Sequence, residues 1–125
     1  MGLAEVLEAD AIYLGINAVD YSGYPDCRPA FLEAFRAVAR LGTKRGVDGC
    51  PAAISAPLLR LSKADIVRLA RDLGVPVGDT LSCYDPRPPH AVGGPAVHCG
   101  RCDACQLRRR GFLDAGVADP TLYER

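Results

Sequence analysis

The chain has 125 residues, of which 49 % are hydrophobic and 24 % charged, a composition ordinary for a globular domain in water. Its 15 basic and 15 acidic side chains balance, so no bulk charge would attract nucleic acid or an anionic membrane. No stretch approaches the roughly 20 apolar residues of a membrane span, and the N-terminus lacks the pattern of a secretory signal. We therefore expect a cytoplasmic chain that interacts directly with neither membrane nor nucleic acid.

The first half of the sequence predicts alternating strands and helices. Residues 3–9 look like the end of a helix, and the apolar run 11–17 fits a strand that is covered on both faces. Pro29 stands where a helix can start, and apolar residues follow it with helical spacing up to about Leu41. A second strand is expected over residues 52–59.

The second half predicts two further helices. The first of these helices begins at Ser62, which is a good N-cap and can form a capping box with Asp65. Gly74 ends this helix. A last helix is expected from Asp103 to about Ala115. The order of the elements predicts an α/β fold with a right-handed parallel crossover. Because two parallel strands make a poor sheet, we interpret the chain as the C-terminal part of a larger doubly wound domain, completed by another chain or by a second copy.

Four of the six cysteines are spaced as in a metal site. Cys99, Cys102 and Cys105 follow two successive C-x-x-C steps, and Cys83 precedes a proline-rich stretch that can fold back on itself. In a reducing compartment this spacing indicates a metal ion better than it indicates disulfides. Four thiolates around zinc leave no position for water, so the predicted ion is structural. An iron–sulfur cluster and four unmetallated thiols are the alternatives.

Other residues near the cysteines could support the predicted metal site. Gly100 lets the turn between two cysteines close tightly. His98 could replace one sulfur, although a solvated loop histidine is the preferred interpretation. The run from Arg108 to Arg110 could contact a partner or RNA, but a run of like charges is usually a solvated face. Nearby arginines could also offset the net negative charge of four thiolates and one divalent cation. These arginines are Arg101, Arg108, Arg109 and Arg110.

The polar segment 17–28, which follows the first predicted strand, is the second candidate site. In open α/β sheets, ligands bind beyond the carboxyl ends of the strands. Tyrosine rings can stack on a flat heterocycle, aspartates can accept from its N–H groups, and an arginine can clamp a carboxylate. A plain polar turn is the alternative interpretation. The candidate residues are Asn17, Asp20, Tyr21, Ser22, Tyr24, Asp26 and Arg28.

Three motifs together resemble the 7-cyano-7-deazaguanine synthase family. They are the string from Leu14 to Pro29, the stretch 57–59 with 61–67, and the stretch 82–85 with 99–105. They occur in the family's order and cover roughly residues 3–120. The resemblance implies an adenine nucleotide alpha hydrolase-like α/β fold with a C-terminal zinc knuckle and helix. It also implies a ligase of queuosine biosynthesis, a tRNA modification pathway, which uses ATP to convert 7-carboxy-7-deazaguanine and ammonia to the nitrile.

The sequence departs from the family in one important respect. Members begin with a Ser-Gly-Gly-x-Asp-Ser phosphate loop, and these 125 residues contain no such string. ATP and magnesium are therefore expected only if an N-terminal half is supplied, by a partner chain or in a larger assembly. The stretch between the first and second cysteines also looks longer than in the family.

We expect one domain over residues 1–125, with an α/β part over 1–80 and a zinc-binding part over 81–120. Two functions remain open. The chain is either the zinc-binding half of such a synthase, inactive alone and with unidentified catalytic residues, or a non-catalytic zinc-stabilised module or relic that binds a deazapurine.

Overall fold

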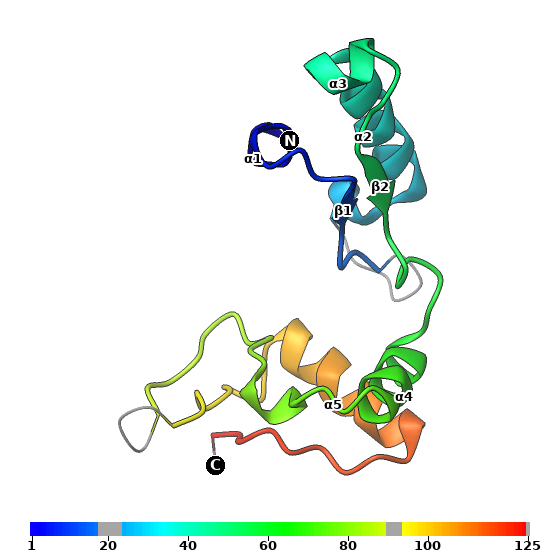
Figure 1. Cartoon of the computed structure of the whole chain (residues 1–125). Helices are drawn as coiled ribbons and strands as arrows, with labels where there is room; N and C mark the ends of the chain where they lie inside the picture. Colours follow the sequence, from blue (N-terminus) through cyan, green and yellow to red (C-terminus); the bar gives the residue numbers. More distant parts are fainter. Residues whose placement is uncertain (18–23, 90–93, 125) are drawn as a thin grey trace. The chain divides into compact units, whose positions relative to one another are not determined.

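A computed structural model describes residues 1–17, 24–89 and 94–124, and all structural statements below concern these residues. The chain forms two compact units, Met1–Leu61 and Ser62–Arg125. Figure 1 shows the helices and strands of each unit. None of the described helices combines the length and the apolar character needed to cross a membrane.

The first unit is a small α/β arrangement. Strands β1 and β2 pair in parallel, with Ile12 opposite Ile54, and lie side by side (Figure 1). This confirms the predicted parallel pairing, but both strands are shorter than expected, and within the described residues they are the whole sheet. The elements are α1 (Gly2–Val6), β1 (Ala11–Tyr13), η1 (Pro25–Cys27), α2 (Pro29–Leu41), α3 (Lys44–Val47) and β2 (Ala53–Ser55).

The core of the first unit lies between α2 and β2. Leu32 and Ala39 on α2 are buried together with Ile54 on β2. Pro29 occupies the first turn of α2, as predicted, because its missing N–H is not needed there. Arg36 ties the helix to the strand: its Nε and Nη2 atoms donate to the Ile54 carbonyl at 3.2 and 3.1 Å.

The second unit is built on two helices, α4 (Lys63–Asp72) and α5 (Asp103–Ala115), with a short 3-10 helix η2 (Val77–Asp79) between them. The predicted capping box at the start of α4 is confirmed. The Asp65 N–H donates to Ser62 Oγ at 3.1 Å, and the Ser62 N–H donates to Asp65 Oδ2 at 3.3 Å. Helix α4 packs on α5, and the two helices come close at Gly111. A Cβ at this position would lie only 2.9 Å from the Cβ of Lys63.

The compact units divide the chain after Leu61, whereas the sequence analysis starts the zinc-binding part at residue 81. The difference arises because α4 packs on α5 and so belongs with the cysteine-bearing segment. The second unit thus contains everything that positions the four cysteines.

Candidate metal centre

The four predicted cysteines come together in the second unit. The Sγ atoms of Cys83, Cys99, Cys102 and Cys105 all lie within 4.8 Å of one another. Cys102 is half-buried and the other three are buried. Helix α5 positions two of them, because Cys102 is its N-cap residue and Cys105 lies in its first turn. The cluster could hold one metal ion.

The sulfur spacing fits a single tetrahedral ion. Zn–S bonds of about 2.3 Å place the sulfurs of a tetrahedral site about 3.8 Å apart, within the observed limit of 4.8 Å. In a four-iron cluster each thiolate binds its own iron, which requires the sulfurs to stand farther apart than around one ion. All four are free thiols, and a set of four sulfur donors suits zinc.

Backbone N–H groups point at two of these sulfurs. Cys83 Sγ accepts from the N–H groups of Cys99 at 3.2 Å and Asp85 at 3.3 Å, and Cys99 Sγ accepts from the Cys102 N–H at 3.4 Å. Such donors favour the thiolate, the form that binds a metal. The turn depends on Gly100, whose φ is +73° and whose Cβ would lie 2.9 Å from an Arg109 nitrogen.

The thiols differ in acidity when no metal is bound. A backbone hydrogen bond from Tyr84 lowers the pKa of Cys102 to about 6. Backbone hydrogen bonds from Arg101 and Cys102 also lower the pKa of Cys99. Burial instead raises the pKa of Cys105 to about 12. Since a coordinating thiol is deprotonated outright, metal binding must release the Cys105 proton at neutral pH.

His98 is not the solvated histidine that the sequence analysis preferred, and that interpretation is wrong. Its relative exposure is 2 %, and its ring meets the Tyr123 ring edge-on at 5.8 Å. Burial and the nearby Arg108 charge lower its pKa, and its Nδ1 atom has no hydrogen-bond partner among the described residues. The sequence signal failed because the residues that bury His98 come from the far end of the chain.

The arginine run does not form one solvated face. Arg110 is exposed and pairs with Asp114 at 2.8 Å, as a solvated charge would. The Arg108 side chain, by contrast, is only 8 % exposed, so the solvated-face interpretation is wrong for it. Its guanidinium donates to the Val77 carbonyl (2.8 Å) and to the hydroxyls of Thr80 (2.9 Å), Ser82 (3.2 Å) and Thr121 (2.6 Å). Arg108 therefore ties the segment before Cys83 to the helix that carries Cys105.

The second candidate site lies only partly within the described residues. Asp20, Tyr21 and Ser22 lie outside them. Asn17 is buried, and its side-chain amide donates to the Leu58 carbonyl at 3.0 Å and to the Leu61 carbonyl. Its amide donors therefore hold the segment after β2. Three further candidates, Tyr24, Asp26 and Arg28, are exposed around η1.

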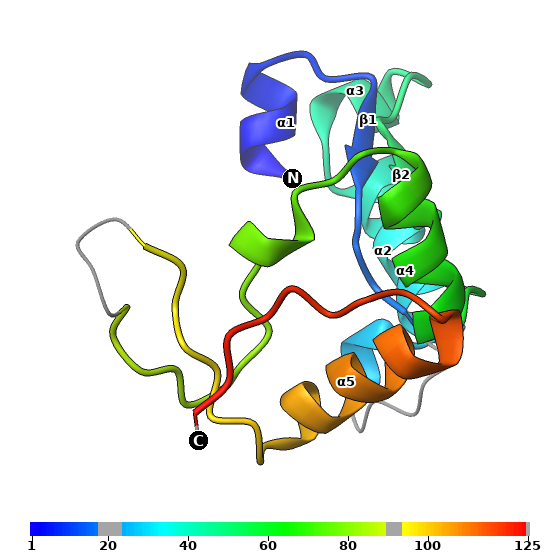
Figure 2. The ribbon, with the colours of Figure 1, turned by 90° about the horizontal axis from the view of Figure 1, so that it is seen from below.

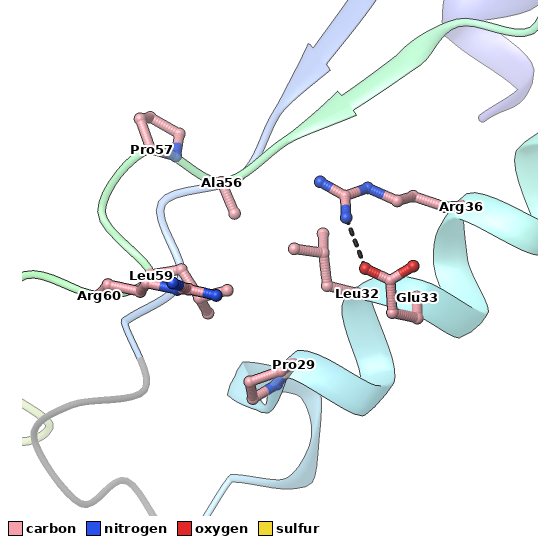
Figure 3. Close-up of a pocket in the computed structure, with 8 residues that line it drawn as sticks. All are labelled: Pro29, Leu32, Glu33, Arg36, Ala56, Pro57, Leu59 and Arg60. Atoms are coloured by element: carbon pink, nitrogen blue, oxygen red, sulfur yellow. Dashed lines mark hydrogen bonds and ion pairs between the residues drawn. The ribbon is translucent and has the colours of Figure 1, made fainter.

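A pocket of about 330 Å³ opens in the first unit (Figure 3). One wall is the first half of α2, where Glu33 and Arg36 form an ion pair at 2.6 Å, and the other is the segment that follows β2. None of the described candidate residues lines it, although Pro29 directly follows Arg28. The lining residues are Pro29, Leu32, Glu33, Arg36, Ala56, Pro57, Leu59 and Arg60.

Comparison with known proteins identifies relatives over nearly the whole chain. The 7-cyano-7-deazaguanine synthase of Anaeromyxobacter dehalogenans (strain 2CP-C) is 62 % identical over 122 residues, which is 98 % of this chain and 49 % of that protein. The synthase of Azoarcus sp. (strain BH72) is 60 % identical over 121 residues, or 97 % of this chain and 50 % of that protein. The synthase of Acinetobacter baylyi is 51 % identical over 98 % of this chain and 51 % of its own length.

The chain thus spans about half the length of the curated relatives it matches. The family model described as queuosine biosynthesis protein QueC matches residues 1–116, which include the first unit, the second unit as far as Gly116, and all four clustered cysteines. This chain therefore belongs to the QueC family of queuosine biosynthesis proteins.

Proposed function

We propose that this chain is the zinc-binding half of a 7-cyano-7-deazaguanine synthase and is inactive alone. The activity would be the ATP-dependent conversion of 7-carboxy-7-deazaguanine and ammonia to the nitrile. The observation that carries this proposal is 62 % identity to such a synthase across 98 % of the chain, with only 49 % of the relative covered. These 125 residues contain the cysteine cluster but no Ser-Gly-Gly-x-Asp-Ser string, as expected for the zinc-binding half of such a synthase.

The proposed metal is zinc, and its role is structural. Cys83, Cys99, Cys102 and Cys105 would supply all four ligands, which leaves no position for a reacting water. When bound, the ion supplies a rigid cross-link between the segment around Cys83 and the first turn of α5. The chain's own N–H groups and the buried Arg108 support the same link without the ion.

The proposed deazaguanine site is the segment 17–28 at the carboxyl end of β1. Ligands of open α/β sheets bind at this end of the strands. Arg28 is exposed and has no ion-pair partner among the described residues, so its guanidinium is available to clamp a carboxylate in two-point fashion. Tyr24 and Asp26 lie beside it and would stack on the base and accept from its N–H groups.

The first unit supports the proposal of a partner half. Parallel sheets are normally covered on both faces, yet Tyr13 on β1 is 73 % exposed, and β1 pairs only with β2 among the described residues. Leu3, Val6 and Leu7, in and just after α1, are exposed as well. We infer that an N-terminal half adds strands beside β1, completes a doubly wound sheet, and brings the phosphate loop with its ATP and magnesium. A second copy of this chain is the alternative partner.

Complementation tests the proposal directly. The chain is mixed with a separately produced N-terminal half of the Anaeromyxobacter dehalogenans relative, and ATP-dependent formation of the nitrile is followed by mass spectrometry. We expect turnover only in the mixture. Arg28→Met should abolish it, whereas Arg40→Met, an exposed arginine in the last turn of α2, should leave it unchanged.

A well-folded complex of the two halves that shows no turnover would contradict the enzyme proposal. Calorimetry of the chain alone with 7-carboxy-7-deazaguanine then decides the alternative. Binding without turnover in any mixture would identify a non-catalytic deazapurine-binding module.

A further inference from the structure

Residues 117–124, here called the C-terminal strap, turn back from α5 toward the metal centre. Gly116 caps α5 with a φ of +68°, and the chain then runs along α5 toward its cysteine-bearing end in both views (Figures 1 and 2). The strap ends as a short parallel bridge to His98, the residue before Cys99. The His98 N–H donates to the Leu122 carbonyl, and the Glu124 N–H donates to the His98 carbonyl, both at 2.8 Å.

The Tyr123 ring packs directly on the cysteines. Like Cys102, it is a partly buried hydrophobic residue that packs against the buried group of Cys83, Cys99 and Cys105. The Arg109 guanidinium carbon lies 3.8 Å from its ring centroid, and the His98 ring meets it edge-on. Its hydroxyl donates to Asp119 at 2.7 Å, within the strap itself. The ring is therefore held in one orientation by contacts on several sides.

Glu124 fastens the end of the strap by charge. Its carboxylate pairs with Arg101 at 3.0 Å and with Arg87 at 3.4 Å. Arg101 lies in the turn between Cys99 and Cys102, and it also pairs with Asp85, two residues after Cys83. The same small charge network thus joins the strap to the turns that carry three of the four sulfurs.

From this geometry we propose that the strap is a cover of the metal centre, in which Tyr123 keeps water and competing ligands away from the thiolates. The inference rests on the proposed zinc site and adds residues that donate no ligand atom. Loss of a thiolate-bound ion requires a proton or a competing ligand to reach the sulfurs. Opening the end of the strap, residues 122–124, breaks two main-chain hydrogen bonds and the ion pairs of Glu124, so opening is a local event that sets the rate of metal exchange.

The test measures metal release from the zinc-loaded chain into an excess of a chromogenic chelator. Residues outside the ligand shell typically change metal binding by about 10- to 100-fold, so we expect Tyr123→Ala and truncation after Gly116 to release zinc at least about tenfold faster. Tyr123→Phe keeps the ring and should remain within about twofold of the parent chain. Arg110→Met, an exposed change on the same helix, is the matched control and should not alter the rate.

Elemental analysis of each protein before mixing separates the two proposals. A parent chain without one zinc per molecule would refute the metal site itself, and the strap's proposed role with it. One zinc per molecule with equal release rates for the parent chain, Tyr123→Ala and the truncated chain would refute the strap alone. If Tyr123→Ala does not fold, Glu124→Gln serves in its place, because it leaves the ring intact and removes the pairs to Arg101 and Arg87; a release rate equal to that of the parent would again refute the cover.

Discussion

Replacement of Arg108 by methionine is the sharpest test of how the second unit is held together. The buried guanidinium makes four hydrogen bonds, to Val77, Thr80, Ser82 and Thr121, and it lies over the Phe112 ring at 5.5 Å. Methionine is unbranched, flexible and has no donor, so the change removes the hydrogen bonds while keeping the packing of the Arg108 stem.

The expected loss follows from the number and type of these bonds. Hydrogen bonds that involve a charged group contribute about 1.5–3 kcal/mol each. After the substitution the exposed Thr80 hydroxyl can bond to water instead, whereas the other three acceptors can do so only partly. We therefore expect a loss of about 3 kcal/mol in the free energy of unfolding. For a chain of this size that corresponds to a decrease of about 10 °C in Tm.

The assay is denaturant unfolding of the zinc-loaded chain, with the m-value as a check that the unfolding transition is unchanged. Arg110→Met is the matched control, because Arg110 belongs to the same arginine run, is 72 % exposed, and pairs only with Asp114 among the described residues. A surface pair of this kind contributes at most about 0.5 kcal/mol. Equal effects of the two substitutions would refute the conclusion that the buried Arg108 links residues 77–82 and Thr121 to α5.

Three further predictions concern single contacts. Ser62→Ala removes the capping box of α4 and should cost about 1 kcal/mol of unfolding free energy in denaturant titrations, whereas no loss would contradict the cap. Gly111→Ala should destabilise by about 1–2 kcal/mol in the same assay despite alanine's higher helix propensity, because its Cβ would lie 2.9 Å from that of Lys63; a stabilised variant would contradict the close helix contact. Tyr123 should ionise near pH 12 in an absorbance titration, because burial and the hydrogen bond to Asp119 raise its pKa to about 12, and Tyr123→Phe should remove that late phase. Since this folded pKa lies above the unfolded value of about 10, the stabilisation is complete below pH 10 and is lost as the pH rises toward 12.

Local signals in the sequence predicted the three longest helices, α2, α4 and α5, but not the short α3. Pro29 with the apolar spacing after it gave the bounds of α2, and Ser62 with Asp65 gave the start of α4, because caps and periodicity depend on neighbouring residues. The grouping of the four cysteines was also predictable, since three of them fall within one short segment. Strand lengths were overestimated, because an apolar run indicates burial but not how many residues find a hydrogen-bonded partner.

The misses are residues whose environment comes from distant parts of the chain. His98 is buried by Tyr123, and Arg108 is buried between residues 77–82 and Thr121. Nothing in the local sequence separates Arg108 from Arg110, because both are arginines of one run on one helix. Residues 77–82 and Thr121 of the C-terminal strap pack around Arg108 and bury it, whereas Arg110 stays solvated.

X-ray absorption at the zinc edge of the purified chain is a direct test of the metal site. We expect one zinc per molecule with four sulfur neighbours at about 2.3 Å and no nitrogen or oxygen in the first coordination shell. A spectrum with fewer than four sulfurs, with a light-atom ligand, or a preparation that contains no zinc would contradict it.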